Sequence, residues 1–337
     1  MPGHPASNGR GALAGLAAFA VFASHDVVVK ILGARFEPFQ IVFFSVLFGF
    51  PIVTVMLMRD RTDGNLRPKH PYWSALRTAM AVITGLCVFY AFSTLPLAET
   101  YAILFSMPLL ITMLAIPVLG EKVGWRRGLA VIVGLIGVIV VLQPGDTELT
   151  LGHLAAVIGA ATGATAAVIV RKIGQDERAA VLLLYPMVAN FVVMACFLPF
   201  VYKPVQLTEL GGFGLMALLS FGGTLLQIAA YRLGSAVIVA PMQYSQIIWA
   251  TLFGVLLFDE IPNMNTAIGA VIIIASGLYI VFREDRKSGS GTPVLRSRSR
   301  FGVPMGAPRV SVMQRLSQRR RTPRGEGAAA PLSPPAE

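Results

Sequence analysis

The chain has 337 residues, of which 55% are hydrophobic and only 13% are charged. This composition excludes an ordinary soluble globular domain and is typical of a polytopic membrane protein. The net charge of +11 is concentrated at the C-terminus: residues 283–337 carry 12 Lys and Arg against 4 Asp and Glu, whereas the other 282 residues carry 16 against 13. A nucleic-acid partner is not expected, because a basic patch that binds nucleic acid belongs to a folded surface.

Ten apolar segments are long enough to cross a bilayer, and the connections between them are short. They lie at residues 12–32, 38–58, 72–92, 96–119, 125–142, 151–171, 181–202, 211–231, 234–258 and 265–282. The sequence therefore predicts an all-α polytopic membrane protein with ten transmembrane helices, arranged largely as helical hairpins.

The two halves of the chain are similar to each other. Residues 98–121 align without a gap on residues 237–260 at an offset of 139, which matches Ser106 with Ser245 and Glu121 with Glu260. At an offset of 141, residues 11–33 align on residues 152–174. We interpret the chain as a tandem duplication, with five-helix repeats at residues 11–142 and 151–282.

The first segment has an alternative interpretation as a signal peptide, because Val21-Phe22-Ala23 resembles a small-residue cleavage site. Its charged n-region is weak, with Arg10 alone. The duplication also pairs it with an internal segment, which cannot be a signal. We therefore favour a transmembrane helix.

The positions of Lys and Arg predict the orientation of the spans. One set of alternate loops and ends holds most of these residues, namely Arg10, Arg59, Arg61, Arg67, Lys69, Lys122, Arg126, Arg127, Arg171, Lys172, Arg178, Arg232 and the tail. Both termini, including residues 1–10, should then be cytoplasmic in an inner (plasma) membrane. Because each repeat has five spans, an odd number, the second repeat should be inverted relative to the first.

The fourth and ninth spans carry polar residues and prolines near their middles. Candidate substrate-binding residues are Ser106, Gln243, Tyr244, Gln246 and Trp249, and candidate helix kinks are Pro108 and Pro241. Buried amides in a bilayer need partners, so these side chains should face the protein interior or a cavity. Core packing of the aromatic rings and interhelical hydrogen bonds of the glutamines are the alternatives.

Three ionisable residues, Asp26, Lys30 and Glu99, are expected in the outward halves of the first and fourth spans. Asp26 and Lys30 are four residues apart, so they share a helix face and can pair. In one interpretation Lys30 extends to the lipid headgroups and Asp26 neutralises it. In the other, Asp26 or Glu99 takes up a proton or a cationic substrate group and serves coupling or gating.

The two cysteines lie in apolar runs and the four histidines are scattered singly. We expect no metal, no cofactor and no catalytic residue. Glycines such as Gly159 and Gly163 should allow close helix packing, and a homodimer through them is left open. Residues 283–337 are expected to be a disordered basic tail, which can rest on anionic lipid.

The paired stretches that end in Glu121 and Glu260 resemble the two EamA repeats of the drug/metabolite transporter superfamily. The resemblance covers nearly the whole chain up to Phe282 and implies a carrier with a central cavity between inverted halves. It implies a small-molecule substrate, such as an amino acid, a nucleobase-type compound, a riboflavin-like vitamin or S-adenosylmethionine. The Ser24-His25-Asp26 stretch departs from the pattern of many relatives, so the resemblance gives it no role.

Two other classes of function compete with a secondary transporter. A polytopic membrane enzyme should gather catalytic groups in a membrane-proximal loop, and the loops here are too short for that. A regulatory membrane protein would leave the polar residues inside the spans unexplained.

Overall fold

The computed structural model describes residues 5–58, 66–121, 124–144, 148–174, 176–234 and 236–286, and these contain helices and no β-strand. In the first half lie α1 (Pro5–Gly33), α2 (Pro38–Met58), α3 (Pro71–Thr94), α4 (Leu97–Leu104), α5 (Met107–Leu119) and α6 (Trp125–Leu142). In the second half lie α7 (Leu151–Ile173), α8 (Ala179–Val201), α9 (Leu207–Leu233), α10 (Ala236–Val239), the 3₁₀-helix η1 (Ala240–Tyr244), α11 (Ser245–Phe258) and α12 (Met264–Arg286).

Eight stretches of helix are long and apolar enough to cross a membrane. They account for eight of the ten predicted spans. Of the other two, the second lies in α2, which is apolar over Pro38–Pro51, and the ninth is divided among α10, η1 and α11. Ten spans therefore remain a prediction. The first and last helices also extend beyond their predicted ends, to Pro5 and to Arg286, and the tail beyond residue 286 lies outside the described residues.

The fourth predicted span is interrupted between α4 and α5, at Phe105 and Ser106. Pro108 explains the interruption, because proline has no N–H with which to bond the carbonyl four residues earlier, that of Leu104. Pro108 instead lies in the first turn of α5. In the ninth span Pro241 lies in the first turn of η1, and α11 begins at Ser245, the equivalent of Ser106.

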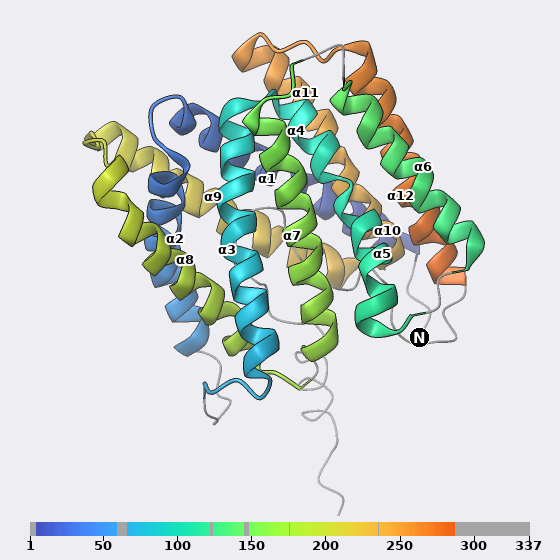
Figure 1. Cartoon of the computed structure of the whole chain (residues 1–337), viewed down its shortest axis with the longest axis horizontal. Coiled ribbons are helices and arrows are strands. Elements are labelled where there is room, and N and C mark those ends of the chain that lie inside the picture. The colour runs from blue at the N-terminus through green and yellow to red at the C-terminus, as the bar shows by residue number, and fades with distance from the viewer. Residues whose placement is uncertain are drawn as a thin grey trace, which may run out of the picture. The chain divides into compact units, whose positions relative to one another are not determined.

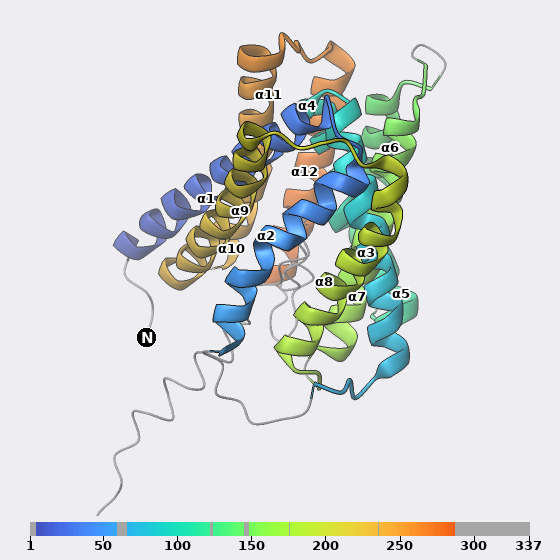
Figure 2. The ribbon, with the colours of Figure 1, turned by 90° about the vertical axis from the view of Figure 1, so that its left-hand side faces the viewer.

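Helices of one half pack against helices of the other. The closest neighbours are α1 with α9 and α3 with α7, and α2 with α8 and α6 with α12 also lie side by side (Figures 1 and 2). In the duplication α1, α2, α3 and α6 correspond to α7, α8, α9 and α12. Exchanging the repeats therefore converts the α1–α9 contact into the α3–α7 contact, and it leaves the other two contacts unchanged.

Glycine allows two of these contacts to be very close. A Cβ atom on Gly137 of α6 would lie 3.0 Å from the carbonyl oxygen of Gly269 of α12, and a Cβ on Gly11 would lie 2.5 Å from the Cα of Gly234. Backbone rather than flexible side chain occupies the space, so any larger residue would force the helices apart. Gly159 and Gly163 of α7, expected to allow close packing, likewise lie against neighbours within the bundle, Val88 of α3 and Met107 of α5.

The contacts also show which helix ends lie together. At the end of α1, Lys30 Nζ donates to the carbonyl oxygen of Leu95, just before α4, and at the start of α7 His153 contacts Glu99 of α4. We call this the Lys30 end. At the opposite end, which we call the Arg171 end, the last turn of α7 meets the end of α5. Thus α1 ends where α7 begins.

Candidate functional site

A buried polar network connects α1, α4 and α11. His25 Nδ1 lies 2.7 Å from Asp26 Oδ1. The hydroxyl of Tyr101 donates to Asp26 Oδ2, and Gln246 Nε2 donates to the Tyr101 hydroxyl over 3.3 Å. All four residues are at most 9% exposed. The network therefore joins a helix and a half-helix of the first repeat to a half-helix of the second.

The chemistry of these groups fixes the direction of most of the hydrogen bonds. An ionised carboxylate only accepts, so both His25 Nδ1–H and the Tyr101 hydroxyl donate to Asp26. The Tyr101 oxygen is then free to accept from the amide of Gln246. The carboxylate of Asp26 is thus held by two donors, which offsets part of the cost of burying its charge.

Three atoms of this region are buried and have no hydrogen-bond partner among the described residues. They are His25 Nε2, Gln246 Oε1 and Trp249 Nε1. An unpaired buried polar atom costs about 1–3 kcal/mol. Two of the three lie one turn apart on α11, where Gln246 Oε1 can accept a hydrogen bond and Trp249 Nε1 can donate one. The pair suits a ligand that carries both a donor and an acceptor.

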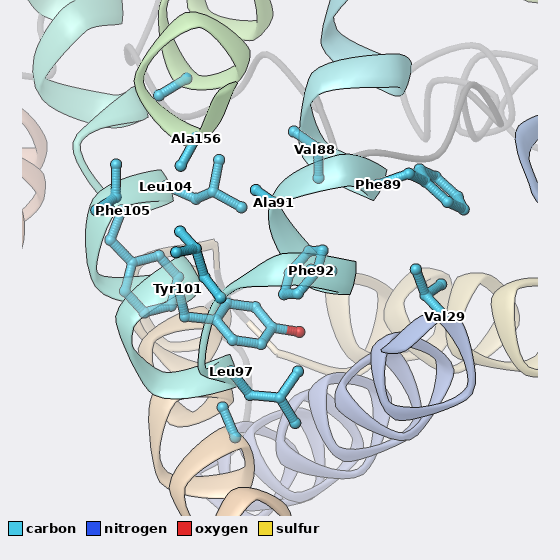
Figure 3. Close-up of a cluster of buried hydrophobic side chains, with 14 of the residues drawn as sticks. Val29, Val88, Phe89, Ala91, Phe92, Leu97, Tyr101, Leu104, Phe105 and Ala156 are labelled. Carbon is cyan, nitrogen blue, oxygen red and sulfur yellow. The ribbon is translucent and has the colours of Figure 1, made fainter. Parts of the chain in front are cut away.

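Apolar side chains enclose the Tyr101 part of the network. The Tyr101 ring contacts those of Phe92 and Phe105, with centroids 5.1 and 5.8 Å away, and Leu97 lies next to it (Figure 3). Its hydroxyl extends out of this cluster toward the side on which Val29 of α1 lies (Figure 3). The apolar surroundings lower the local dielectric constant and strengthen the hydrogen bonds of the network.

The remaining predicted substrate residues lie around the interruptions of the two spans. Ser106 is buried as the N-cap of α5, and Tyr244 is buried with its ring 5.2 Å from that of Phe105. Trp249 stacks on Phe253 at 6.4 Å. Gln243 is half-buried, and its side chain forms no hydrogen bond with any described residue. The structure therefore brings Gln246 into the network but not Gln243.

The expected pair between Asp26 and Lys30 is wrong. Lys30 Nζ instead lies 2.5 Å from Glu260 Oε1, and Glu260 Oε2 accepts from the backbone N–H of Leu97 at the start of α4. The Lys30 side chain is 12% exposed and also lies over the Phe258 ring, so it does not extend to lipid headgroups. A cross-repeat partner has replaced the local one that helical spacing favours.

The Arg171 end carries the counterpart of this ion pair. Arg171 Nη2 pairs with Glu121 Oε1 across the α7–α5 contact. The duplication aligns Lys30 with Arg171 and Glu260 with Glu121. Each repeat therefore contributes the cation of one pair and the carboxylate of the other, and the two pairs lie at opposite ends of the bundle.

Glu99, the third ionisable candidate, belongs to the Lys30 end. Its Oε1 lies 2.8 Å from His153 Nε2, while His153 Nδ1 lies 3.1 Å from the backbone N–H of Thr150. Because that N–H needs an acceptor, Nδ1 carries no proton and Nε2–H donates to Glu99. A cavity of about 90 Å³ lies beside these groups, and both Glu99 and Glu260 line it.

Sequence reasoning missed Tyr101, the residue that joins Asp26 to Gln246. A tyrosine in an apolar run is usually a residue of the hydrophobic core. The one sequence feature that pointed to a polar role for Tyr101 was its position two residues after Glu99, in a span that carries other polar residues. Glu260 and Glu121 were noticed as a repeated feature without a partner. Lys30 and Arg171, which align with each other at the offset of 141, were the signal that a pair exists at each end.

Comparison with known proteins supports a transporter. The model of the EamA-like transporter family matches twice, over residues 9–143 and 150–282. An S-adenosylmethionine uptake transporter of Rickettsia bellii is 27% identical over 266 residues, covering 78% of this chain and 90% of that protein. A riboflavin transporter of Brucella anthropi is 25% identical over 284 residues, with 80% and 97% covered, and a pseudopaline exporter of Pseudomonas aeruginosa is 25% identical over 266 residues, with 78% and 93% covered.

A solved crystal structure has the same fold. It aligns with a TM-score of 0.56 at 18% identity and covers 83% of this chain and 99% of its own. The two family matches together cover nearly all of the chain before residue 283, and the relatives are transporters rather than enzymes. This chain is an integral membrane protein that belongs to the EamA-like transporter family.

Proposed function

We propose that the chain is a secondary carrier of the bacterial inner membrane, which moves a small metabolite through a site between two inverted five-helix repeats. The observation that carries the proposal is the polar network between α1, α4 and α11, with Gln246 Oε1 and Trp249 Nε1 buried and unpartnered beside it. A site that spans both repeats changes whenever one repeat moves against the other. That is the requirement for a carrier.

The two ion pairs supply the two closures of an alternating-access cycle. Lys30–Glu260 ties the ends of α1 and α11 together at one end, and Arg171–Glu121 ties α5 to α7 at the other. Both pairs are intact in this structure, and in each open conformation we expect one pair to separate while the other stays intact. The Lys/Arg distribution favours the Lys30 end as the outward side, with both termini cytoplasmic.

Among the candidate substrates, we propose S-adenosylmethionine as the first to test. Several relatives are S-adenosylmethionine uptake transporters, at 26–28% identity over 78–79% of this chain. The molecule has an adenine ring with N–H donors and ring-nitrogen acceptors, which match the free acceptor of Gln246 and the free donor of Trp249. Riboflavin has the same kinds of group on its ring system and is the second substrate to test.

Counterflow in sealed proteoliposomes tests the proposal. Vesicles preloaded with unlabelled S-adenosylmethionine should take up the labelled compound transiently, and Gln246→Leu should reduce the initial rate at least ten-fold while leaving the amount of folded protein unchanged. Thr165→Val is the matched control, since Thr165 bonds only to a carbonyl of its own helix. Equal rates for Gln246→Leu and wild type would place the site elsewhere.

A further inference from the structure

A second group of unpartnered polar atoms lies on α3, away from the network of Asp26 and Gln246. Arg77 Nε, Ser74 Oγ and Thr78 Oγ1 are all buried and have no hydrogen-bond partner among the described residues. Ser74 is only 4% exposed. Positions three and four residues apart share a helix face, so the three groups lie together.

Arg77 is charged and lies about 9 Å from the start of α3, at 1.5 Å per residue. In the described part of the chain it forms no ion pair. Two other cations of this end are engaged: Arg171 binds Glu121, and Lys172 donates to the carbonyl oxygen of Val118 and lies over Trp73. A guanidinium in a membrane span without a counter-charge is costly and usually marks a functional site.

The duplication indicates which way this face of α3 points. At the offset of 139, Ser74, Arg77 and Thr78 correspond to Phe213, Met216 and Ala217 of α9. Those three residues are 0%, 0% and 3% exposed. The face of α9 at these positions is therefore interior, and on the same face of α3 Ser74 is buried while Arg77 and Thr78 are half-buried.

Independent contacts support this alignment of α3 with α9. Thr84 of α3 lies against Gly163 of α7, and its equivalent Gly223 of α9 lies against Phe22 of α1. Phe22 is the equivalent of Gly163 at the offset of 141. Replacing each residue by its equivalent therefore converts the contact between α3 and α7 into the contact between α9 and α1, as the alignment requires.

We infer that Arg77, with Ser74 and Thr78, binds a carboxylate group of the transported molecule. Arginine presents two parallel N–H donors that match the two oxygens of a carboxylate, and the serine and threonine hydroxyls add further donors on the same face. The inference rests on the proposed carrier function and narrows its substrate. S-adenosylmethionine has a carboxylate on its amino-acid part, whereas riboflavin has none.

A test that needs no substrate uses thiol reagents of opposite charge. In a Cys87→Ala, Cys196→Ala background, Thr78→Cys is treated with an anionic and with a cationic methanethiosulfonate, and the rates are divided by those for free cysteine. The anionic reagent should be favoured, and Arg77→Gln should lower this preference on the order of ten-fold. Arg126→Gln, which removes an exposed arginine that lies over Trp125, should leave it unchanged.

If Thr78→Cys is not modified, or if the preference for the anionic reagent is the same after Arg77→Gln, the inference is wrong. Ser74→Cys replaces Thr78→Cys if the latter does not fold.

A second experiment measures binding of S-adenosylmethionine and of its decarboxylated analogue. Arg77→Gln should weaken the first about ten- to a hundred-fold and leave the second unchanged. If wild type binds neither compound, the proposed substrate is wrong, while the thiol arm still decides the role of Arg77.

Discussion

The rings of Phe105 and Tyr244 lie in edge-to-face contact, with centroids 5.2 Å apart and an interplanar angle of 72°. The two residues are equivalents at the offset of 139. Equivalent residues touch only near the axis that exchanges the repeats, so this contact marks where the two interrupted spans cross. Two members of the polar network lie close to it along the chain, since Tyr101 is four residues before Phe105 and Gln246 is two residues after Tyr244.

Tyr244 also provides the first prediction. A Cβ on Gly277 of α12 would lie 1.9 Å from the Tyr244 hydroxyl oxygen, so Gly277→Ala should destabilise the protein by about 1–3 kcal/mol through overpacking. Tyr244→Phe removes that oxygen and should restore part of the loss in the double mutant. Thermal unfolding in detergent measures all three variants. Purely additive effects would show that the two residues do not touch.

Much of this fold could be predicted because duplication and apolar length are both visible in the sequence. The offset of 139 aligns Glu121 with Glu260, and the offset of 141 aligns Lys30 with Arg171, from the sequence alone. The partner of each charge could not be predicted, since helical spacing favours Asp26 for Lys30 and only the cross-repeat packing brings Glu260 closer. Arg77 went unnoticed for a related reason: its burial depends on helices that are distant in the sequence.

The second prediction concerns the cross-repeat ion pair at the Lys30 end. Lys30→Glu or Glu260→Lys alone places like charges together in a partly buried site and should abolish transport, because a charge left unpaired there costs several kcal/mol. The double swap restores the pair and should recover a measurable part of the counterflow rate. Arg35→Gln is the control, since it breaks a more exposed pair with Glu209 at the same end.

The third prediction assigns proton coupling to Asp26. Its neighbours His25 and Tyr101 are the titratable groups that contact it. Asp26→Asn keeps the shape and removes the charge. This variant should still catalyse exchange of substrate but lose accumulation driven by a pH gradient.

Glu99→Gln provides the comparison for Asp26→Asn. Glu99 lies at the Lys30 end and is bonded to His153 rather than to the network. If only Glu99→Gln uncouples transport from the pH gradient, the coupling site is Glu99. If neither variant does, both carboxylates are structural.

The fourth prediction concerns orientation. Alkaline phosphatase fused after Glu148 or Asn263 should be active, because these positions belong to loops that are predicted to be periplasmic. Fusions after Asp63, Gln175 or Lys287 should be inactive, and a cytoplasmic reporter should give the opposite pattern. Activity of both sets with the same reporter would contradict the inverted arrangement.

The central claim is that the two ends of the bundle open alternately, and distances between spin labels test it most directly. One label pair spans the Lys30 end at Thr94 and Ile261, and another spans the Arg171 end at Ile116 and Leu233, in a background without Cys87 and Cys196. Glu260→Gln should lengthen the first distance and leave the second short, and Glu121→Gln should do the reverse. If both distances lengthen together, or neither responds to either variant, the ion pairs do not close the two ends in turn.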